Sequence, residues 1–303
     1  MSGMSFNSEN NFYYSPMAYT ARCSSVVPSP TPIVRPNGMY KSSGDSLPQF
    51  QPTRKLDYEL ELAFFISNPV PSGTIVSPES AEEHIFGYVL MNDWSARDIQ
   101  MYESLPVGPL NCKAFGTTIS PWVVMPEALA HARTEPRNQR ARKDQIPAHL
   151  KQDNLSQSTY EITCHAFLQR SGSEVAKPVS TSSTAHMFWS PGQLLAHRAS
   201  TGCGLLTGEL IGLGTVSSPE ELWPDKSLER RGCLFEITND GKEDVNINDI
   251  GGRWLEDGDI VVLEAWAPGD DGVKIGFGKV SGRVLPETSS SMLKTTNKNG
   301  THI

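Results

Sequence analysis

The sequence that decides the fold is Leu56-Asp57-Tyr58-Glu59-Leu60-Glu61-Leu62, together with the later stretch Ile85-Phe86-Gly87-Tyr88-Val89-Leu90-Met91. Side chains of a β-strand point alternately to the two faces of its sheet. The first stretch therefore places its leucines and Tyr58 on one face and its acids, Asp57, Glu59 and Glu61, on the other. The second stretch is apolar almost throughout, which is typical of a strand buried on both faces.

Segments with strand character recur along the chain and are separated by Gly, Pro and Asn residues typical of turns. We expect strands at residues 56–66, 85–91, 122–125, 160–168, 233–238, 260–265 and 280–285. Short helices are expected at 80–84, 126–132 and 191–199, and the last has Pro191 directly after Ser190, as helix N-termini often do. This pattern predicts a β-dominated α+β fold and not a regular βαβ alternation.

The ends of the chain are polar and rich in serine, which is typical of loosely held termini. We therefore expect a disordered N-terminal segment at residues 1–15, one catalytic domain at 16–286 and a disordered tail at 287–303. A chain of 303 residues is long enough to bury a substantial core.

Charge and composition exclude several classes of protein. The chain has 34 acidic and 26 basic residues and a net charge of -8, which argues against nucleic acid as a partner. Its apolar runs are shorter than the roughly 18 residues of a membrane helix, and its N-terminus lacks the apolar core of a secretory signal. The five cysteines are scattered without CxxC spacing, as in a reduced cytoplasmic protein.

Three acids could bind a cation. On one strand face Glu59 and Glu61 would lie about 7 Å apart, and Asp93 follows a buried strand, where a side chain can point into a cleft. Ligands made only of carboxylates favour Mg²⁺ or Ca²⁺ over zinc. Such a strand is more often solvated, however, and Asp93 could equally cap its strand. Lys113, three residues before Gly116, could stabilise an oxyanion, although a single lysine is more often on the surface.

Taken together, these segments resemble the fumarylacetoacetase family. The resemblance is carried by LDYELE at 56–61, HIFG at 84–87, LMNDWSARDIQ at 90–100, KAFGTTISPWVV at 113–124, GTVS at 214–217 and IGFG at 275–278. The similarity runs in family order from about residue 16 to residue 286. The blocks around Asp93 and Gly116 are long and specific to fumarylacetoacetase proper.

The resemblance implies a fold, a reaction and a partner. The fold is a mixed β-sandwich roll that forms a homodimer. The reaction is hydrolysis of the C–C bond of a 3,5-dioxo acid, fumarylacetoacetate giving fumarate and acetoacetate, in the breakdown of tyrosine and phenylalanine. Glu59, Glu61 and Asp93 match three of the family's four acidic ligands, which would hold Mg²⁺ or Ca²⁺.

The resemblance also implies roles for six further residues. Arg97, Gln100 and Lys113 match residues that hold the substrate and stabilise the departing enolate. The positions that match substrate contacts are Tyr19 and Thr215. Glu229 matches the glutamate that orients a water-activating histidine.

The chain also departs from the family pattern. In the family, the fourth acidic ligand and the catalytic histidine precede the position of Tyr19, but residues 1–17 contain no His and no Asp. We therefore expect the N-terminal domain and the catalytic-histidine segment to be absent and activity to be impaired. The alternatives are a metal-dependent decarboxylase or lyase acting on a β-keto acid, and a non-catalytic truncated paralogue. A truncated gene model would explain the same departure.

Overall fold

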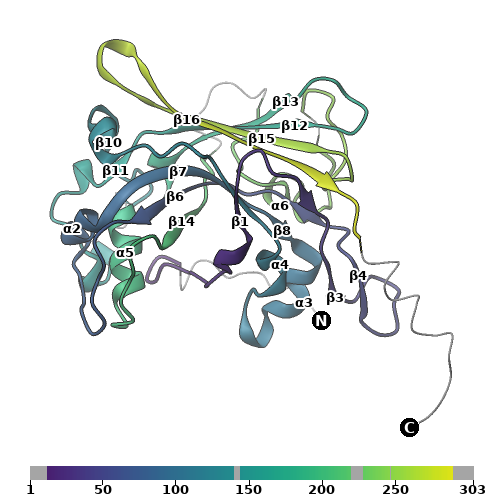
Figure 1. Cartoon of the computed structure of the whole chain (residues 1–303), viewed down its shortest axis with the longest axis horizontal. Coiled ribbons are helices and arrows are strands. Elements are labelled where there is room, and N and C mark those ends of the chain that lie inside the picture. Colours follow the sequence, from purple (N-terminus) through teal and green to yellow (C-terminus); the bar gives the residue numbers. More distant parts are fainter. Residues whose placement is uncertain (1–11, 140–143, 220–227, 246, 289–303) are drawn as a thin grey trace, which may run out of the picture.

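The computed structural model describes residues 12–139, 144–219, 228–245 and 247–288. Within these residues, two five-stranded mixed sheets lie one above the other (Figure 1). The first sheet has the order β1 (Val26–Pro28), β9 (Thr117–Ile119), β7 (Ile85–Asp93), β6 (Leu60–Ile66) and β14 (Leu210–Thr215). The second has the order β13 (Lys177–Ser183), β12 (Thr163–Gln169), β15 (Ile260–Pro268), β16 (Lys274–Leu285) and β2 (Ile33–Val34).

Short strand pairs and helices complete the described part of the chain. The pairs are β3 (Asn37–Tyr40) with β4 (Gln49–Pro52), β5 (Leu56–Asp57) with β8 (Ser95–Ala96), and β10 (Arg133–Thr134) with β11 (Thr159–Tyr160). The α-helices are α2 (Pro78–Ala81), α3 (Arg97–Val107), α4 (Asn111–Ala114), α5 (Pro191–Ala199) and α6 (Leu234–Ile237). The 3₁₀ turns are Cys23–Ser25, Glu82–His84, Pro126–Ala132, Ala148–Leu150, Leu155–Gln157, Thr184–His186 and Asp270–Gly272.

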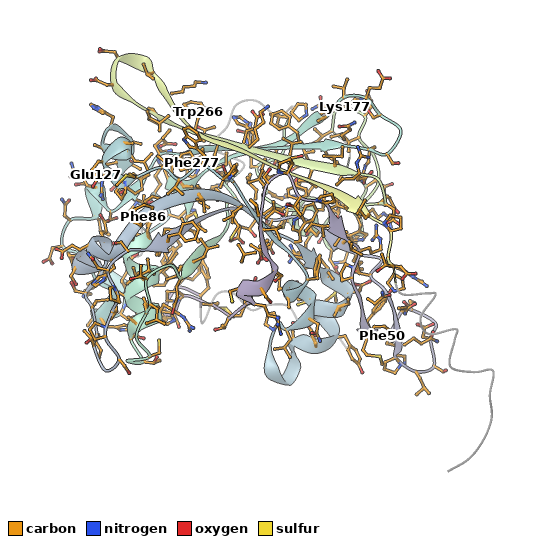
Figure 2. The ribbon with its side chains drawn as sticks, in the orientation of Figure 1. Phe50, Phe86, Glu127, Lys177, Trp266 and Phe277 are labelled. Carbon is orange, nitrogen blue, oxygen red and sulfur yellow. The ribbon has the colours of Figure 1, made fainter. Side chains whose placement is uncertain are left out.

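The main core lies between the two sheets. The antiparallel strands β6 and β7 pair with Leu62 opposite Leu90, and both leucines are fully buried in the same core cluster. Phe277 of β16 is also fully buried and lies between the β15–β16 hairpin and β7 (Figure 2). Because side chains alternate along a strand, the opposite face of β6 and β7 carries Glu61 and Asp93. That face lies on the side of α3 and α4.

The predicted β-dominated α+β fold and mixed β-sandwich are confirmed. The helix predicted at 191–199 is confirmed with the same bounds. The Ser190 side chain accepts the backbone N–H of Gln193, whose own side chain accepts the backbone N–H of Ser190. This reciprocal cap satisfies two N–H groups that a helix start leaves unpaired.

Several predicted strands are wrong. Residues 233–238 contain α6, because the Asp57 carboxylate accepts the N–H groups of Leu234 and Phe235 and so caps a helical turn. Residues 122–125 make only an isolated bridge from Val124 to Tyr88. The strand predicted at 56–66 is split into β5, paired with β8, and β6, paired with β7. Helix α3 was not predicted.

Most of the predicted disordered ends, residues 1–11 and 289–303, lie outside the described residues. Phe12 and Tyr13, which belong to the predicted N-terminal segment, pack against Phe188 with ring centroids 5.8 and 4.9 Å away. In the described part of the chain, no helix is both long and apolar enough to span a membrane.

Candidate metal centre

The acids Glu59, Glu61 and Asp93 meet below the first sheet. Glu61 lies on β6 and Asp93 ends β7, while Glu59 directly precedes β6. Each offers a carboxylate oxygen, and these oxygens all lie within 4.8 Å of one another. All three residues are buried, with exposed fractions of 8%, 5% and 6%. The strand alternation predicted the shared face of Glu59 and Glu61, and the pairing of β6 with β7 adds Asp93.

Two cations hold these acids together. Lys113 of α4 is 3% exposed, and its Nζ donates to Glu59 Oε2 and to Asp93 Oδ2, the latter at 2.9 Å. Arg97, at the start of α3, places Nη1 2.9 Å from Glu59 Oε1. Lys113 is therefore buried, whereas its sequence context alone favoured a position on the surface. We call these five residues, Glu59, Glu61, Asp93, Arg97 and Lys113, the acidic centre.

Asp57 has a role that the sequence did not reveal. Its Oδ2 accepts from both Nε and Nη2 of Arg97 at 2.8 Å. It also accepts the N–H of Leu234 at 2.8 Å and of Phe235 at 2.9 Å. Asp57 is fully buried, and the break between β5 and β6 keeps it out of the acidic cluster. The break follows from the separate pairing of β5 with β8, which a pattern of alternating residues does not contain.

The charges of the centre shift the pKa values of its acids in opposite directions. Burial raises the pKa of Glu59, but the Lys113 and Arg97 charges outweigh it and lower the pKa to about 2. Burial raises the pKa of Glu61 well above its usual range, and the neighbouring charges of Glu59 and Asp93 raise it further. Glu61 is thus the acid for which an added cation would relieve the largest unfavourable interaction.

The residues present fit a divalent cation. Asp93 Oδ1 is buried and has no hydrogen-bond partner in the described structure, which is unusual for a buried polar atom. With all groups ionised, the acidic centre and Asp57 combine four carboxylates with two cations. A cation of charge +2 would therefore neutralise the site. The all-oxygen donor set matches the preference of Mg²⁺ and Ca²⁺.

The predicted substrate residues Tyr19, Gln100 and Thr215 all neighbour the acidic centre. The Tyr19 hydroxyl donates to Asp93 Oδ2, and Gln100 Oε1 accepts from Arg97 Nη1 at 3.1 Å. Thr215 pairs with Glu61 across β14 and β6. Glu229 lies beside β13, where its N–H donates to Val179 and its carbonyl accepts from Thr181. The roles of these residues stay predictions.

Comparison with known proteins places this chain in a family. Residues 4–285 match the family profile described as "Fumarylacetoacetate (FAA) hydrolase C-terminal". The chain is 43% identical over 283 residues to the fumarylacetoacetase of Emericella nidulans, covering 91% of this chain and 62% of that protein. The chain belongs to the fumarylacetoacetate hydrolase family. The human fumarylacetoacetase is 38% identical over 282 residues, covering 91% of this chain and 63% of that protein.

The chain thus spans about 62% of the length of the curated fumarylacetoacetases it matches. Solved structures share the fold. A fumarylacetoacetate hydrolase from Exiguobacterium antarcticum superimposes with a TM-score of 0.52 at 21% identity, covering 89% of this chain and 66% of that one. Fumarylpyruvate hydrolase from Pseudomonas aeruginosa, in complex with Mn²⁺ and pyruvate, gives a TM-score of 0.51 at 20% identity, covering 94% and 83%.

Proposed function

We propose that the chain hydrolyses the C–C bond of a 3,5-dioxo acid of the fumarylacetoacetate type, as part of tyrosine and phenylalanine catabolism. The observation that carries the proposal is the acidic centre, in which three buried carboxylates converge, two of them pair with Lys113, and one carboxylate oxygen has no hydrogen-bond partner among the described residues. The family relationship over 91% of the chain supports the same reaction. The cytoplasmic location expected from the sequence stays a prediction.

The reaction balances with water as the second reactant. The water oxygen bonds to the carbonyl carbon of the acyl group, and the bond between that carbon and the neighbouring CH₂ breaks. The electron pair leaves as the enolate of acetoacetate, which takes up one proton, and a second proton is released with the acyl carboxylate. Lys113 Nζ, held between Glu59 and Asp93, is placed to stabilise the enolate oxygen.

Glu59, Glu61 and Asp93 would hold Mg²⁺ or Ca²⁺, which polarises the ketone oxygens of the substrate when bound. Arg97 orients Glu59 and contacts Gln100, so these side chains fix the edge of the site on the α3 side. Tyr19 and Thr215 would contact the substrate from the N-terminal segment and from β14. Glu229 is proposed as a positioning residue for the group that activates water.

The test is the loss of fumarylacetoacetate absorbance with the purified protein in Mg²⁺ or Ca²⁺ and again in EDTA. We expect turnover that needs the cation and falls at least about 100-fold in Glu61→Gln. Glu174→Gln, an exposed acid outside the centre, is the matched control and should retain activity. Turnover unchanged by EDTA would contradict the proposal. Decarboxylation of oxaloacetate without hydrolysis of fumarylacetoacetate would favour the decarboxylase alternative.

A homodimer is also proposed, on the evidence of an exposed apolar patch. Phe86, Trp122, Val123 and Met125 are 47%, 63%, 36% and 48% exposed. Phe86 projects from β7 on the side where the β15–β16 hairpin extends (Figure 2). Gly87 lies against Val123, and Gly278 of the hairpin lies against Trp122, so the patch and the hairpin are continuous. Contiguous apolar surface of this kind commonly marks an interface.

Light scattering coupled to size-exclusion chromatography tests the dimer. The wild type should have twice the chain mass, and Trp122→Asp should shift it to the monomer because a charge in an apolar interface is costly. Leu206→Asp, at a position that is 69% exposed outside the patch, is the control and should remain dimeric. A monomeric wild type at micromolar concentration would contradict the dimer without affecting the proposed reaction.

A further inference from the structure

A pocket of about 560 Å³ lies beside the acidic centre. The two share β14: Leu213, Gly214 and Thr215 line the pocket, and the Gly214 N–H donates to Glu61 Oε2 at 3.1 Å. The pocket and the acidic centre therefore border the same residues of β14. The volume lies within the range of about 300–1,000 Å³ that is typical of small-molecule sites.

The pocket walls are mostly aromatic and aliphatic. Phe188 and Trp189, both 5% exposed, stand edge to face with centroids 4.9 Å apart. Phe12 lies against this pair, and its carbonyl accepts from Trp189 Nε1 at 3.0 Å. Leu194 of α5 and Met187 add aliphatic surface. We call this cavity the aromatic pocket.

Three polar side chains of the aromatic pocket are already paired. Asn138 donates to the carbonyl of His186, and Ser217 donates to Glu236 at 2.7 Å. His186 Nδ1 lies 2.8 Å from Ser218 Oγ. Burial and the Arg137 charge lower the pKa of His186, which favours its uncharged form. Among the described residues that line the pocket there is no Lys, Arg, Asp or Glu.

These walls discriminate between ligands by charge. A second carboxylate on the substrate would lose its hydration in the pocket and meet no counter-ion on the lining, which is strongly unfavourable. An apolar group would gain the free energy of removing its surface from water. Aromatic rings suit the pocket further, because edge-to-face contacts with Phe188 and Trp189 favour them.

We propose that the aromatic pocket binds an apolar acyl or aryl group of a 1,3-dicarbonyl substrate whose ketone oxygens lie at the acidic centre. This inference rests on the proposed function and sharpens its substrate class. The chain then prefers dioxo acids that carry an apolar substituent on the acyl side to those that carry a second carboxylate there.

Binding tests the pocket separately from catalysis. Isothermal titration calorimetry in Mg²⁺ compares acetylacetone with benzoylacetone, which share the diketone and differ by a phenyl group. We expect the dissociation constant of benzoylacetone to be at least about tenfold lower. The difference should shrink to less than about threefold in Leu194→Lys, which places a cation in the pocket. The matched control Leu206→Lys, at an exposed position outside the pocket, should retain the tenfold difference.

Leu194 is half-buried, so Met17→Lys serves as a second variant. Met17 lines the same pocket and is 64% exposed, so this change is compatible with folding, and it should reduce the benzoylacetone preference at least about threefold. Equal affinities for the two diketones in the wild type, or no binding of either, would overturn the proposal. A preference that survives both folded pocket variants would overturn it too, because the phenyl group would then bind elsewhere.

Hydrolysis in the same preparations separates this inference from the proposed function. We expect a higher kcat/KM for 3,5-dioxo-5-phenylpentanoate than for fumarylacetoacetate. Faster turnover of fumarylacetoacetate, together with equal diketone affinities, would support the reaction and overturn the pocket assignment. Tight, pocket-dependent benzoylacetone binding without any C–C hydrolysis would support the pocket as a site for apolar diketones and overturn the proposed reaction.

Discussion

The molecule buries two clusters of polar side chains, and the clusters differ in charge and in how completely their hydrogen-bonding groups are paired. The acidic centre is charged and incompletely paired, because Asp93 Oδ1 has no partner in the described structure. The second cluster is neutral: Gln139, Gln193, Ser190 and Gln152 join α5 to the segments before it. We call it the amide cluster. Both clusters are largely buried, and an unpaired buried polar atom is costly.

Pairing in the amide cluster is complete for its two buried glutamines. Gln139 and Gln193 are 1% and 0% exposed. Gln139 Nε2 donates to Gln193 Oε1 at 2.8 Å and to the Phe188 carbonyl at 2.7 Å. Gln193 Nε2 donates to Gln139 Oε1 and to the Leu150 carbonyl. A saturated network stabilises the fold, whereas the acidic centre keeps binding capacity for a ligand.

The largest expected loss of stability follows from removing Asp57, which links the acidic centre to the core. Asp57→Ala leaves Arg97 without one of its partners and leaves the N–H groups of Leu234 and Phe235 without their acceptor. We expect the free energy of unfolding in urea to fall by about 3–5 kcal/mol.

The control is Asp244→Ala, which breaks the exposed ion pair with Arg253. Such pairs contribute about 0–1 kcal/mol. Equal losses in the two variants would mean that the Asp57 pair contributes no more than a surface ion pair.

The next prediction separates the two clusters by cation binding. Glu61→Gln should weaken Mg²⁺ or Ca²⁺ binding at least about 100-fold in calorimetry, because loss of a direct ligand costs more than the roughly 10- to 100-fold of an outer contact. Gln193→Leu should leave the cation affinity unchanged while lowering the free energy of unfolding by about 2–3 kcal/mol. Weaker cation binding in Gln193→Leu than in Glu61→Gln would contradict the assignment of cation binding to the acidic centre alone.

The pH dependence of stability should also differ between the acids. In EDTA the raised pKa of Glu61, caused by burial and by Glu59 and Asp93, makes the folded state bind a proton that the unfolded state releases. The stabilisation is therefore full below about pH 4.5 and is lost as the pH rises toward the folded pKa, by at most about 1.4 kcal/mol per unit. Glu59, with its pKa of about 2, contributes stability that is lost as the pH falls from about 4.5 to 2.

Urea unfolding at pH 5, 6, 7 and 8 measures the Glu61 effect. Relative to the wild type, Glu61→Gln should gain stability as the pH rises, since it lacks the titrating carboxyl. Parallel curves for the two proteins would show that Glu61 keeps an ordinary pKa. Adding Mg²⁺ should make the wild type more stable than Glu61→Gln, because only the wild type retains all three acids that would bind the cation.

The smallest effect is expected at the helix cap of the amide cluster. Ser190→Ala removes the acceptor for the Gln193 N–H and the donor to Gln152, and should cost about 1 kcal/mol. The midpoint temperature of thermal unfolding should fall by a few degrees. Ser77→Ala removes the exposed N-cap of the four-residue helix α2. A larger loss of stability in Ser77→Ala than in Ser190→Ala would contradict the importance of the buried amide cluster.

The sequence predicted the features that depend on local periodicity. The alternation at residues 56–62 put Glu59 and Glu61 on one face, and the Ser190-Pro191 pair marked the start of α5. The family resemblance added Lys113, Arg97 and Tyr19, whose contacts with the acids join positions far apart in the chain.

The missed features depend on contacts that no local pattern contains. Cys233 to Thr238 has the β-branched and aromatic composition of a strand, but Asp57 caps it as a helix across the fold. The aromatic pocket forms because the HMFW run at 186–189 meets Phe12 and Leu213. The run itself was visible in the sequence, but its partners were not.

The N-terminal segment from Phe12 to Tyr19 contacts both the acidic centre and the aromatic pocket. One end packs on Phe188 and Trp189, and the other end donates the Tyr19 hydroxyl to Asp93. An occupant that fixes one end leaves less conformational entropy to be lost at the other. Cation and organic ligand should therefore bind with positive cooperativity, each lengthening the residence time of the other, and this coupling is reciprocal.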